Sequence, residues 1–409
     1  MPLRALLKIR EFSVGDKSRN KEKTSLLKKS HILLFEQKKE VTMKQSSELQ
    51  AMLKEILGWN KARLSCFTKM LLALFSVRTV NLRELAVAFA SDALVDSRHK
   101  RLKRFFSNFK VDTGIIAPWI FKLFFPETKK VYLIIDRTNW YWGKQKINIF
   151  MLGVAYEGLA IPLYWRLLPK AGNSNFTEQK TLLNRFFTTF GTSRVVGLLA
   201  DREFASGELF RWLNAQKVPF YIRIKEGSVI ASRNKKILTA KKFFNGLKPK
   251  NSKEFPMAVW IFGQKVYLAG SRSERGELMI IATNQLPKNA IPIYLRRWEI
   301  EMLFQSLKGR GFRFEETRLT HYERIEKLIL LLVIGFCWAH KVGEWLAFNK
   351  PIPFNHYRES LRPQYSYFRY GFDLIRETLL NPWRRLTIFR DFVNQMTRSF
   401  SSNILRNLA

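Results

Sequence analysis

The run Val131-Tyr132-Leu133-Ile134-Ile135-Asp136 is the first of two apolar stretches that stop at an aspartate, and the second is Val195-Val196-Gly197-Leu198-Leu199-Ala200-Asp201. Short apolar runs bounded by polar residues are typical of buried strands. An aspartate at the end of such a strand leaves the core on a rigid support, as a metal ligand requires. We therefore expect both strands to end at their aspartates, and we take Asp136 and Asp201 as candidate metal ligands.

A third carboxylate lies on a predicted helix that runs from Tyr294 to Lys308. At about 100° per residue, with Tyr294 as zero, Arg297 falls near about −60° and Glu301 near about −20°. Lys308 falls near about −40°, so four reactive or charged side chains share one stripe about 60° wide. Glu299 points to about +140°, on the far side of the helix. The pattern favours Glu301 as the third carboxylate and predicts that Glu299→Ala leaves catalysis nearly unchanged.

The spacing Tyr294-x2-Arg297-x3-Glu301-x6-Lys308 resembles the Y-R-E-K signature of the DDE transposases of bacterial insertion sequences, in the group numbered four. Asp201-Arg202-Glu203 resembles the second-aspartate motif of that group, and Asp136 with Arg137-Thr138-Asn139-Trp140 resembles the first. The resemblance covers roughly residues 80–345. It implies an RNase H-like catalytic core, two Mg²⁺ ions for which Mn²⁺ can substitute, and cut-and-paste transposition of a DNA element.

The order of elements expected around the aspartates agrees with that core. Residues 147–156 and 159–168 flank Glu157-Gly158, a tight-turn pair that predicts an antiparallel meander with the Asp136 strand. The elements expected next are a helix over 177–190, the Asp201 strand, a helix over 207–217 and a strand over 220–224. Three meandering strands followed by helix, strand, helix and strand is the RNase H order.

The predicted fold class is α/β. It comprises an RNase H-like core interrupted by a β-rich insertion, an N-terminal helical DNA-binding domain and a C-terminal helical region. The predicted segments are 1–42, a disordered arm or upstream extension; 43–125, the helical DNA-binding domain; 126–225, the first part of the core; 226–285, the insertion; 286–345, the second part with the glutamate helix; and 346–409, the C-terminal region. Translation from Met1 or from Met43 remains open.

The insertion is inferred from a surplus of chain, because Asp201 and Glu301 are 100 positions apart and a bare core needs far fewer. It contains Trp260, the only tryptophan between Trp212 and Trp298. In the resembled group, an insertion-domain tryptophan stacks on a base that is flipped out as a DNA hairpin forms. The alternative is a core tryptophan of the small β-domain, since apolar residues surround it in the sequence.

A strong positive charge points to a polyanionic partner. The chain has 71 Lys and Arg against 33 Asp and Glu, a formal net charge of +38. Residues 80–106 predict a helix, a short turn and a basic helix, the outline of a helix-turn-helix DNA reader. The alternative is a solvated basic face on a structural helix. The candidate DNA-binding residues of the second helix are Arg98, Lys100, Arg101, Lys103 and Arg104.

The resemblance also implies a mechanism. Two metal ions held by hard oxygen ligands activate an attacking oxygen and stabilise the leaving oxygen of a phosphodiester. Asp136 would bridge the ions, with Asp201 and Glu301 each completing one side. Tyr294, Arg297 and Lys308 would contact DNA phosphates near the scissile bond. The alternative for Arg297 is an ordinary surface ion pair with Glu301 at i+4.

We therefore expect a transposase that cuts insertion-sequence ends and joins them to target DNA, through a hairpin intermediate. The alternatives are a metal-dependent nuclease or resolvase on the same fold, and an inactive relative that only binds DNA. The expected partners are element ends, target DNA and a second copy of the chain in a synaptic complex. We expect a bacterial cytoplasmic, nucleoid-associated protein without a secretion signal. The apolar run over residues 328–339 is shorter than the roughly 20 residues of a membrane span.

Overall fold

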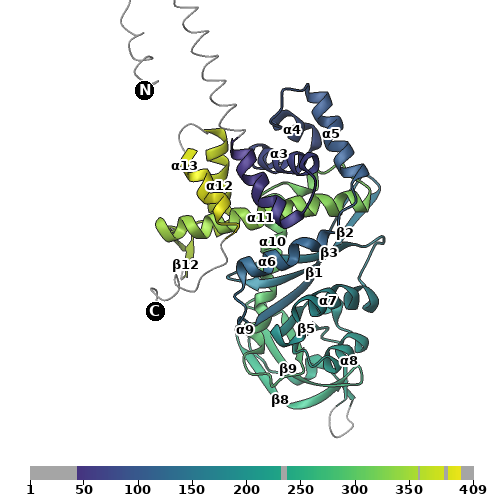
Figure 1. Ribbon diagram of the computed structural model, residues 1–409. Coiled ribbons are helices and arrows are strands. Elements are labelled where there is room, and N and C mark those ends of the chain that lie inside the picture. The colour runs from purple at the N-terminus through teal and green to yellow at the C-terminus, as the bar shows by residue number, and fades with distance from the viewer. Residues whose placement is uncertain (1–43, 232–236, 358–359, 382–385, 398–409) are drawn as a thin grey trace, which may run out of the picture.

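Ten strands form one mixed sheet in the computed structural model, which describes residues 44–231, 237–357, 360–381 and 386–397 (Figure 1). The strands follow the order β3-β2-β1-β4-β5-β10-β9-β8-β6-β7 across the sheet. The protein is therefore of the mixed α/β class that the sequence predicts. The predicted arm over residues 1–42 and the alternative start at Met43 lie outside the described residues.

The first half of the sheet contains the two strands that carry the aspartates. Its members are β1 (Val131–Trp142), β2 (Gln145–Tyr156), β3 (Leu159–Leu167), β4 (Val195–Ala200) and β5 (Phe220–Ile224). Strands β1, β2 and β3 form an antiparallel meander, and β4 and β5 run parallel to β1. Glu157 and Gly158 have φ values of 48° and 82°, as expected for the predicted tight turn between β2 and β3. The element order in this half is the one that the sequence predicts.

Strand β1 is longer than expected. It does not end at Asp136 but continues for six more residues to Trp142. The extension has a physical cause: β2 pairs with it along its whole length, up to the pair Trp142↔Gln145, and Gly143 with a φ of 55° allows the turn. Only the parallel partner β4 stops, after the pair Ile135↔Ala200. Asp136 thus lies where β4 leaves β1, within a strand rather than at its end.

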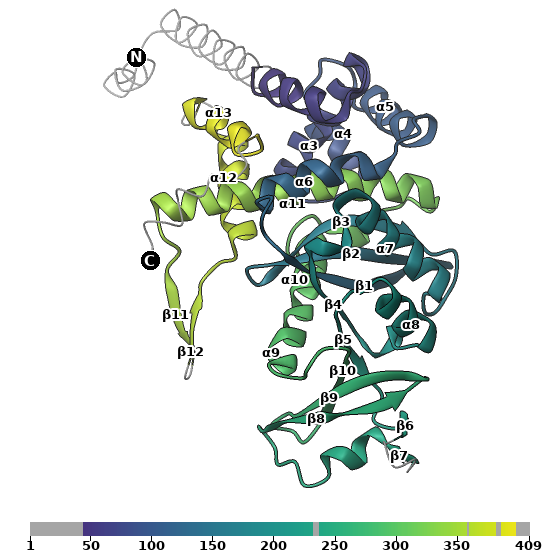
Figure 2. The same ribbon diagram turned by 60° about the horizontal axis from the view of Figure 1, so that its bottom comes forward.

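The second half of the sheet comes from the segment predicted as a β-rich insertion. Its strands are β6 (Val229–Ala231), β7 (Ile237–Thr239), β8 (Ser252–Ile261), β9 (Gln264–Arg272) and β10 (Leu278–Thr283). Strand β10 pairs antiparallel with β5, so these strands extend the first half without a break. A short 3₁₀ helix, η5 (Ala240–Phe244), lies between β7 and β8. Figure 2 shows β8 and β9 at the end of the sheet remote from the N-terminal helices.

Helices cover both faces of the sheet (Figures 1 and 2). On one face lie α7 (Phe176–Phe190) and α8 (Gly207–Ala215), flanked by the 3₁₀ helices η3 (Thr192–Arg194) and η4 (Arg202–Phe204). Helix α7 begins with a capping box in which Asn175 and Glu178 bond to each other's backbone N–H groups. The other face is covered by α9 (Ala290–Leu295), η6 (Arg296–Trp298) and α10 (Glu299–Leu307). Helix α10 packs against β1, β2 and β3.

The predicted single helix from Tyr294 to Lys308 is wrong in two respects. A 3₁₀ turn over Arg296–Trp298 separates α9 from α10, and its tighter winding changes the angular positions of the residues after it. Lys308 has a ψ of −133° and lies beyond the last helical residue. The stripe of four side chains therefore does not exist as drawn on a continuous helix. Tyr294, Arg297 and Glu301 nevertheless approach the same two aspartates, as described below.

The N-terminal helices do not form a separate body. They comprise a helix over 44–57, α3 (Lys61–Val77), α4 (Leu82–Ala88), α5 (Val95–Asn108), η2 (Thr113–Ile116) and α6 (Ala117–Phe124). Residues from Leu49 to Met396 belong to one continuous hydrophobic core, because α3 and α5 pack on α11 (Tyr322–Asn349) and α3 packs on α12 (Tyr367–Leu380). Helix α13 (Leu386–Asn394) follows α12. Figure 1 shows α3, α4 and α5 stacked on α11.

Helix α11 contains the apolar run over residues 328–339, and all of these residues are buried. None of the described helices is long and apolar enough to cross a membrane. Three charged side chains of α11 are buried with partners: those of Lys327, Lys341 and Glu344. Lys327 donates to the backbone carbonyls of Phe106 and Phe109. Glu344 accepts from the Tyr156 hydroxyl at 2.7 Å and from Lys341. These contacts connect α11 to α5 and to the sheet.

The C-terminal region contains a β-hairpin that the sequence does not predict. Strands β11 (Phe354–Tyr357) and β12 (Ser360–Pro363) pair with each other and with no other strand among the described residues. Figure 2 shows the hairpin projecting from the junction of α11 and α12. Pro351 and Pro353 precede the hairpin, and Pro363 is its last residue. The residue before a proline favours an extended backbone and disfavours a helical one.

Candidate active site

Asp136 and Asp201 lie on neighbouring strands at the same level of the sheet. The last pair between the parallel strands β1 and β4 is Ile135↔Ala200, and each aspartate is the next residue along the chain, Asp136 within β1 and Asp201 just after β4. The side chain of Asp136 is 16% exposed and that of Asp201 is 31% exposed. Sequence patterns predicted the pair, and the parallel register brings the two carboxylates to one edge.

Arg297 connects the third carboxylate to this pair. Its Nη1 lies 2.9 Å from Asp136 Oδ2, and its Nη2 lies 2.6 Å from Glu301 Oε1. The arginine side chain is only 8% exposed, whereas that of Glu301 is 39% exposed. The i+4 ion pair between Arg297 and Glu301 therefore exists, but it is not an ordinary surface pair. One buried guanidinium holds a strand carboxylate and a helix carboxylate together.

Tyr294 completes the network on the side of Asp201. Its hydroxyl donates to Asp201 Oδ1 at 3.3 Å, and Arg223 Nη1 lies 3.9 Å from the same oxygen. Tyr294 is fully buried between α9 and the sheet. Arg297 packs beside its ring, with the guanidinium carbon 5.8 Å from the ring centroid. The structure thus brings together five predicted site residues: Asp136, Asp201, Tyr294, Arg297 and Glu301.

Asp136 is the carboxylate of the network whose charge is most affected by burial. Burial raises the pKa of Asp136 to about 6, although Arg297 and the backbone N–H of Arg137 oppose this rise. Burial would lower the pKa of Arg297, but Tyr294, Asp136 and Glu301 together hold it above its usual range. Burial also raises the pKa of the Tyr294 hydroxyl. Arg297 therefore stays protonated, and Asp136 gains from any additional positive charge placed beside it.

The residues fit a hard divalent cation by the chemistry of their donors. Three carboxylates provide the oxygen ligands that Mg²⁺ prefers, and the most buried of them is short of positive charge. No three His, Cys, Asp or Glu side chains lie together as a ready-made metal cluster within the described part of the chain. Arg297 stands between Asp136 and Glu301 instead. Arg297 contacts one oxygen of Asp136 and one oxygen of Glu301, so ions that bind all three carboxylates would share these two side chains with the arginine.

Lys308 lies apart from the carboxylate network. Its ammonium forms an ion pair with Glu315 at 2.9 Å and lies 5.0 Å from the ring centroid of Trp140. Trp140 belongs to the unexpected extension of β1 and packs edge-on against Phe314, with ring centroids 4.9 Å apart. The extension therefore supports Lys308, while Lys308 remains 20% exposed.

A second ion pair, which no sequence pattern predicted, lies beside the aspartates. Arg137, the residue after Asp136, donates to both carboxylate oxygens of Glu203 at 2.6 Å. Further donations reach Asn148, Asn173 and the carbonyl of Gly172. Arg137 lies in the motif segment of Asp136, and Glu203 lies in that of Asp201. Because the two strands run parallel and in register, this placement could have predicted the ion pair.

Glu299 has a structural position on the opposite side of α10 from Glu301. It is 7% exposed, and its Oε2 accepts the backbone N–H of Tyr156 at 2.6 Å next to the turn between β2 and β3. Its Oε1 lies 3.0 Å from Arg296 Nε. The preference for Glu301 over Glu299 agrees with this geometry. Glu299→Ala would lower stability, because the change leaves a buried backbone N–H without its acceptor, while its near-neutral effect on catalysis stays a prediction.

The five candidate DNA-binding residues of α5 fall into two groups. Arg98 donates to the carbonyls of Ala86, Val87 and Ala93, and Arg101 donates to the carbonyl of Ala62. These two arginines hold α5 against neighbouring segments of the N-terminal module. The exposed members are Lys100, Lys103 and Arg104.

Trp260 does not fill the core of the inserted strands. It is 49% exposed on β8, and its neighbour across the ladder is Lys265. Through the pairing of β8, β9, β10 and β5, Lys265 lies level with the start of β5. Asp201 follows the end of β4, which runs parallel to β5, so the two lie toward opposite ends of these strands. The structure therefore makes the Trp260 ring available to a partner but does not bring it into the carboxylate network.

Comparisons with known proteins find a family match and similarity to a solved structure. Residues 127–338, just over half of the chain, match the protein family described as Transposase DDE domain. No curated protein matches the chain. Among solved structures, the chain is similar to a piggyBac transposase in a synaptic complex with hairpin DNA, with 11% sequence identity and a TM-score of 0.40. That similarity covers 84% of this chain and 77% of the other.

Proposed function

The chain belongs to the family of transposases that contain a DDE domain, and we propose that it cuts DNA at the ends of a bacterial insertion sequence and joins those ends to target DNA. The observation that carries the proposal is the network of Asp136, Asp201 and Glu301, which one arginine and one tyrosine connect at a single edge of the sheet. The spacing of Tyr294, Arg297, Glu301 and Lys308 supports membership of the Y-R-E-K group.

The proposed catalytic core is RNase H-like. The supporting observation is the order β3-β2-β1-β4-β5, with an antiparallel meander followed by two parallel strands. Two aspartates at the parallel edge and a glutamate from the covering helix α10 complete the arrangement. The β6–β10 strands extend this core as the proposed insertion.

In the proposed mechanism, Asp136, Asp201 and Glu301 would hold two Mg²⁺ ions, for which Mn²⁺ can substitute. Such ions activate the attacking oxygen and neutralise the leaving oxygen of a phosphodiester. Arg297 holds Asp136 and Glu301 in place and keeps their negative charges from repelling each other. Tyr294 orients Asp201 by donating a hydrogen bond to it.

We propose that the basic and aromatic residues of the signature also contact the DNA. Lys308 is the best placed for a phosphate contact, because it lies outside the carboxylate network and is partly exposed. Arg297 and Tyr294 are buried, so their contact with a phosphate near the scissile bond depends on rearrangement when DNA and metal bind. Trp260, with its exposed ring, is proposed to stack on a flipped base as a hairpin intermediate forms.

The proposed partners follow from charge and from the reaction. A net charge of +38 suits a protein that binds two element ends and a target, and the exposed cations of α5 are proposed to bind the ends. Joining two ends requires two active sites, so we propose a homodimer in a synaptic complex. The protein would act on the chromosome in a bacterial cytoplasm.

A cleavage assay with purified protein tests the proposal. Duplex DNA taken from the sequences that flank the coding region is incubated with Mg²⁺, and nicked, hairpin and joined products are resolved. Wild-type protein should yield all three, whereas Asp136→Asn should yield none while still binding the duplex. Cleavage without joining would identify a nuclease or resolvase, and binding without cleavage would identify an inactive DNA-binding relative. Either result would refute the proposed transposition.

A further inference from the structure

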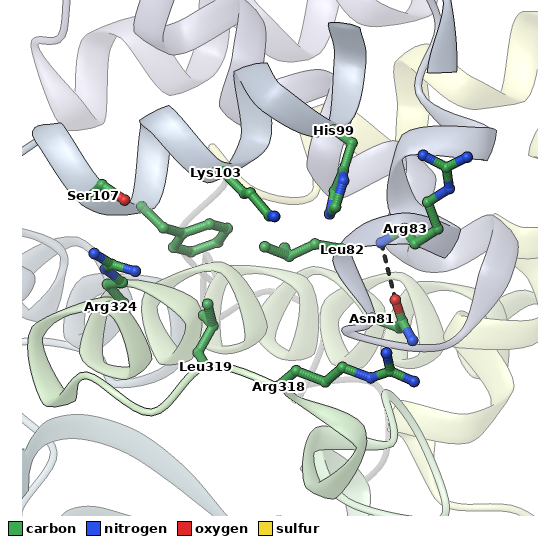
Figure 3. Close-up of a pocket in the computed structure, with 10 residues that line it drawn as sticks. Asn81, Leu82, Arg83, His99, Lys103, Ser107, Arg318, Leu319 and Arg324 are labelled. Atoms are coloured by element: carbon green, nitrogen blue, oxygen red, sulfur yellow. Dashed lines mark hydrogen bonds between the residues drawn. The ribbon is translucent and has the colours of Figure 1, made fainter. Parts of the chain in front are cut away.

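A second basic site lies at the junction of the N-terminal helices and the catalytic region, outside the carboxylate network. It is a cavity of about 420 Å³ between α4 and α5 on one side and the segment that leads into α11 on the other. Figure 3 shows Lys103 and His99 extending from α5, with Arg318 and Arg324 opposite them. Arg83, at the start of α4, completes the basic lining. We refer to it as the junction pocket.

The lining of the junction pocket is positively charged without compensation. It contains four Lys or Arg side chains and one histidine, but no acidic residue. Only Arg83 has an ion-pair partner, Asp96, whose side chain is 75% exposed. Within the described part of the chain, no carboxylate lies within ion-pair distance of Lys103, Arg318 or Arg324. Three cations from two parts of the chain therefore face a shared space without a protein anion.

His99 reports the potential inside the junction pocket. Burial lowers its pKa, and the positive charges of Lys103 and Arg83 lower it further, while Asp96 opposes them. Burial disfavours any charge on the ring, but the contributions of Lys103 and Arg83 reflect a positive potential, and a positive potential favours an anion. An anion bound between these side chains would offset the repulsion that they exert on one another.

The geometry of the junction pocket is held by buried contacts. Lys327 on α11 donates to the carbonyls of Phe106 and Phe109 at the end of α5, the second at 2.7 Å. Thr79 before α4 donates to Glu316, which precedes the Arg318 segment. The two walls are thus fixed to each other, so their cations need little reorganisation to bind a ligand.

We propose that the junction pocket binds a phosphate group of the DNA backbone. The inference rests on the proposed function. It adds a contact between α5 and the catalytic region, where a bound duplex would pass from one to the other. Arginine suits the phosphate because its planar guanidinium can donate two hydrogen bonds to one phosphate, and lysine adds a point charge. Backbone contacts of this kind fix the register of a protein on DNA and carry no sequence information.

Salt-dependent binding of duplex DNA tests the proposal in the full-length protein. The variant Lys103→Gln/Arg324→Gln removes one cation from each wall of the junction pocket. The control Lys122→Gln/Lys180→Gln removes the same charge from exposed positions on α6 and α7. For each lost phosphate contact, the slope of log affinity against log salt should fall by about 0.9. The junction variant should show that reduction and the control should not, and equal slopes in the two variants would overturn the proposal.

The histidine gives a second readout that identifies the source of the phosphate. The chain has five histidines, and the His99 ring signal in an NMR spectrum can be assigned with His99→Gln. Duplex DNA should raise the pKa of His99, and Lys103→Gln/Arg324→Gln should abolish that rise. Inorganic phosphate that shifts His99 while duplex DNA does not displace it would instead indicate a free-phosphate site and overturn the proposal. A wild-type protein that binds DNA here but never cleaves it would refute the proposed function alone.

Discussion

Exchanging each of two neighbouring glutamates for glutamine should produce opposite defects. Glu301 and Glu299 are two positions apart on α10, but Glu301 faces the aspartates and is partly exposed. Glu299 is buried beneath the turn between β2 and β3 and accepts a backbone N–H. Because glutamine preserves the size of both side chains, the pair separates the loss of charge from the loss of volume.

The expected magnitudes follow from these contacts. In Glu301→Gln, the amide oxygen can still accept from Arg297, and the lost charge was partly solvated, so the stability cost should be at most about 1 kcal/mol. Loss of a ligand for the ions should cost about 4 kcal/mol of transition-state stabilisation, which is about a thousandfold in cleavage rate. Glu299→Gln replaces a charged acceptor of the buried Tyr156 N–H with a neutral one, a loss of about 1–2 kcal/mol in the free energy of unfolding.

Two assays on the same preparations measure the contrast. Urea denaturation gives the free energy of unfolding, and first-strand nicking with Mg²⁺ gives the rate per folded molecule. Glu301→Gln should keep its stability and lose nicking, whereas Glu299→Gln should lose stability and keep nicking. Equal nicking by the two variants, or equal loss of stability, would refute the assignment of the two faces of α10.

Three further outcomes can be measured. Trp260→Ala should cost at most about 1 kcal/mol of stability, because the ring is 49% exposed, and it should reduce hairpin formation while nicking persists; loss of both activities would exclude a stacking role. Lys100→Ala/Arg104→Ala should lower the salt slope of end binding by about two units without unfolding the protein; an unchanged slope would make this a solvated face. Glu344 has a pKa lowered to about 2 by the histidine and lysine beside it on α11, against the effect of burial, so it contributes stability above its usual pKa of 4.5. The stability advantage of wild type over Glu344→Gln should therefore shrink as the pH falls from about 4.5 to about 2, and an advantage that is constant over this range would contradict the ion-pair assignment.

The elements that the sequence predicted correctly are those marked by continuous apolar runs or by characteristic turn residues. The meander, the turn at Glu157 and Gly158, and the strand before Asp201 all follow from apolar runs and turn residues. The extension of β1 beyond Asp136 does not, because its polar and aromatic residues form a strand only through pairing with β2. The hairpin β11–β12 escaped prediction for a similar reason, since residues 354–356 and 361–363 are all exposed and no alternation of buried and exposed residues marks them.

The candidate site was predictable in its members but not in its connections. Carboxylates after apolar runs and a spaced signature identified Asp136, Asp201 and Glu301. A uniform rotation of 100° per residue could not reveal the 3₁₀ turn at Arg296–Trp298 or the departure of Lys308 from the helix. Nor could it reveal that Arg297 is buried, because burial depends on the strand that faces the helix.

The attachment of α5 to α11 through Lys327 fixes the distance between the N-terminal helices and the carboxylates. The N-terminal helices share one core with the catalytic sheet, and a buried ammonium fastens the end of α5 to the long helix beneath it. A DNA-binding domain on a flexible linker would tolerate variable spacing between the sequence that it binds and the bond that the catalytic domain cuts. Here that spacing is fixed by the packing of side chains, so under the proposed function the dimensions of the folded chain would define where along a bound duplex the reaction occurs.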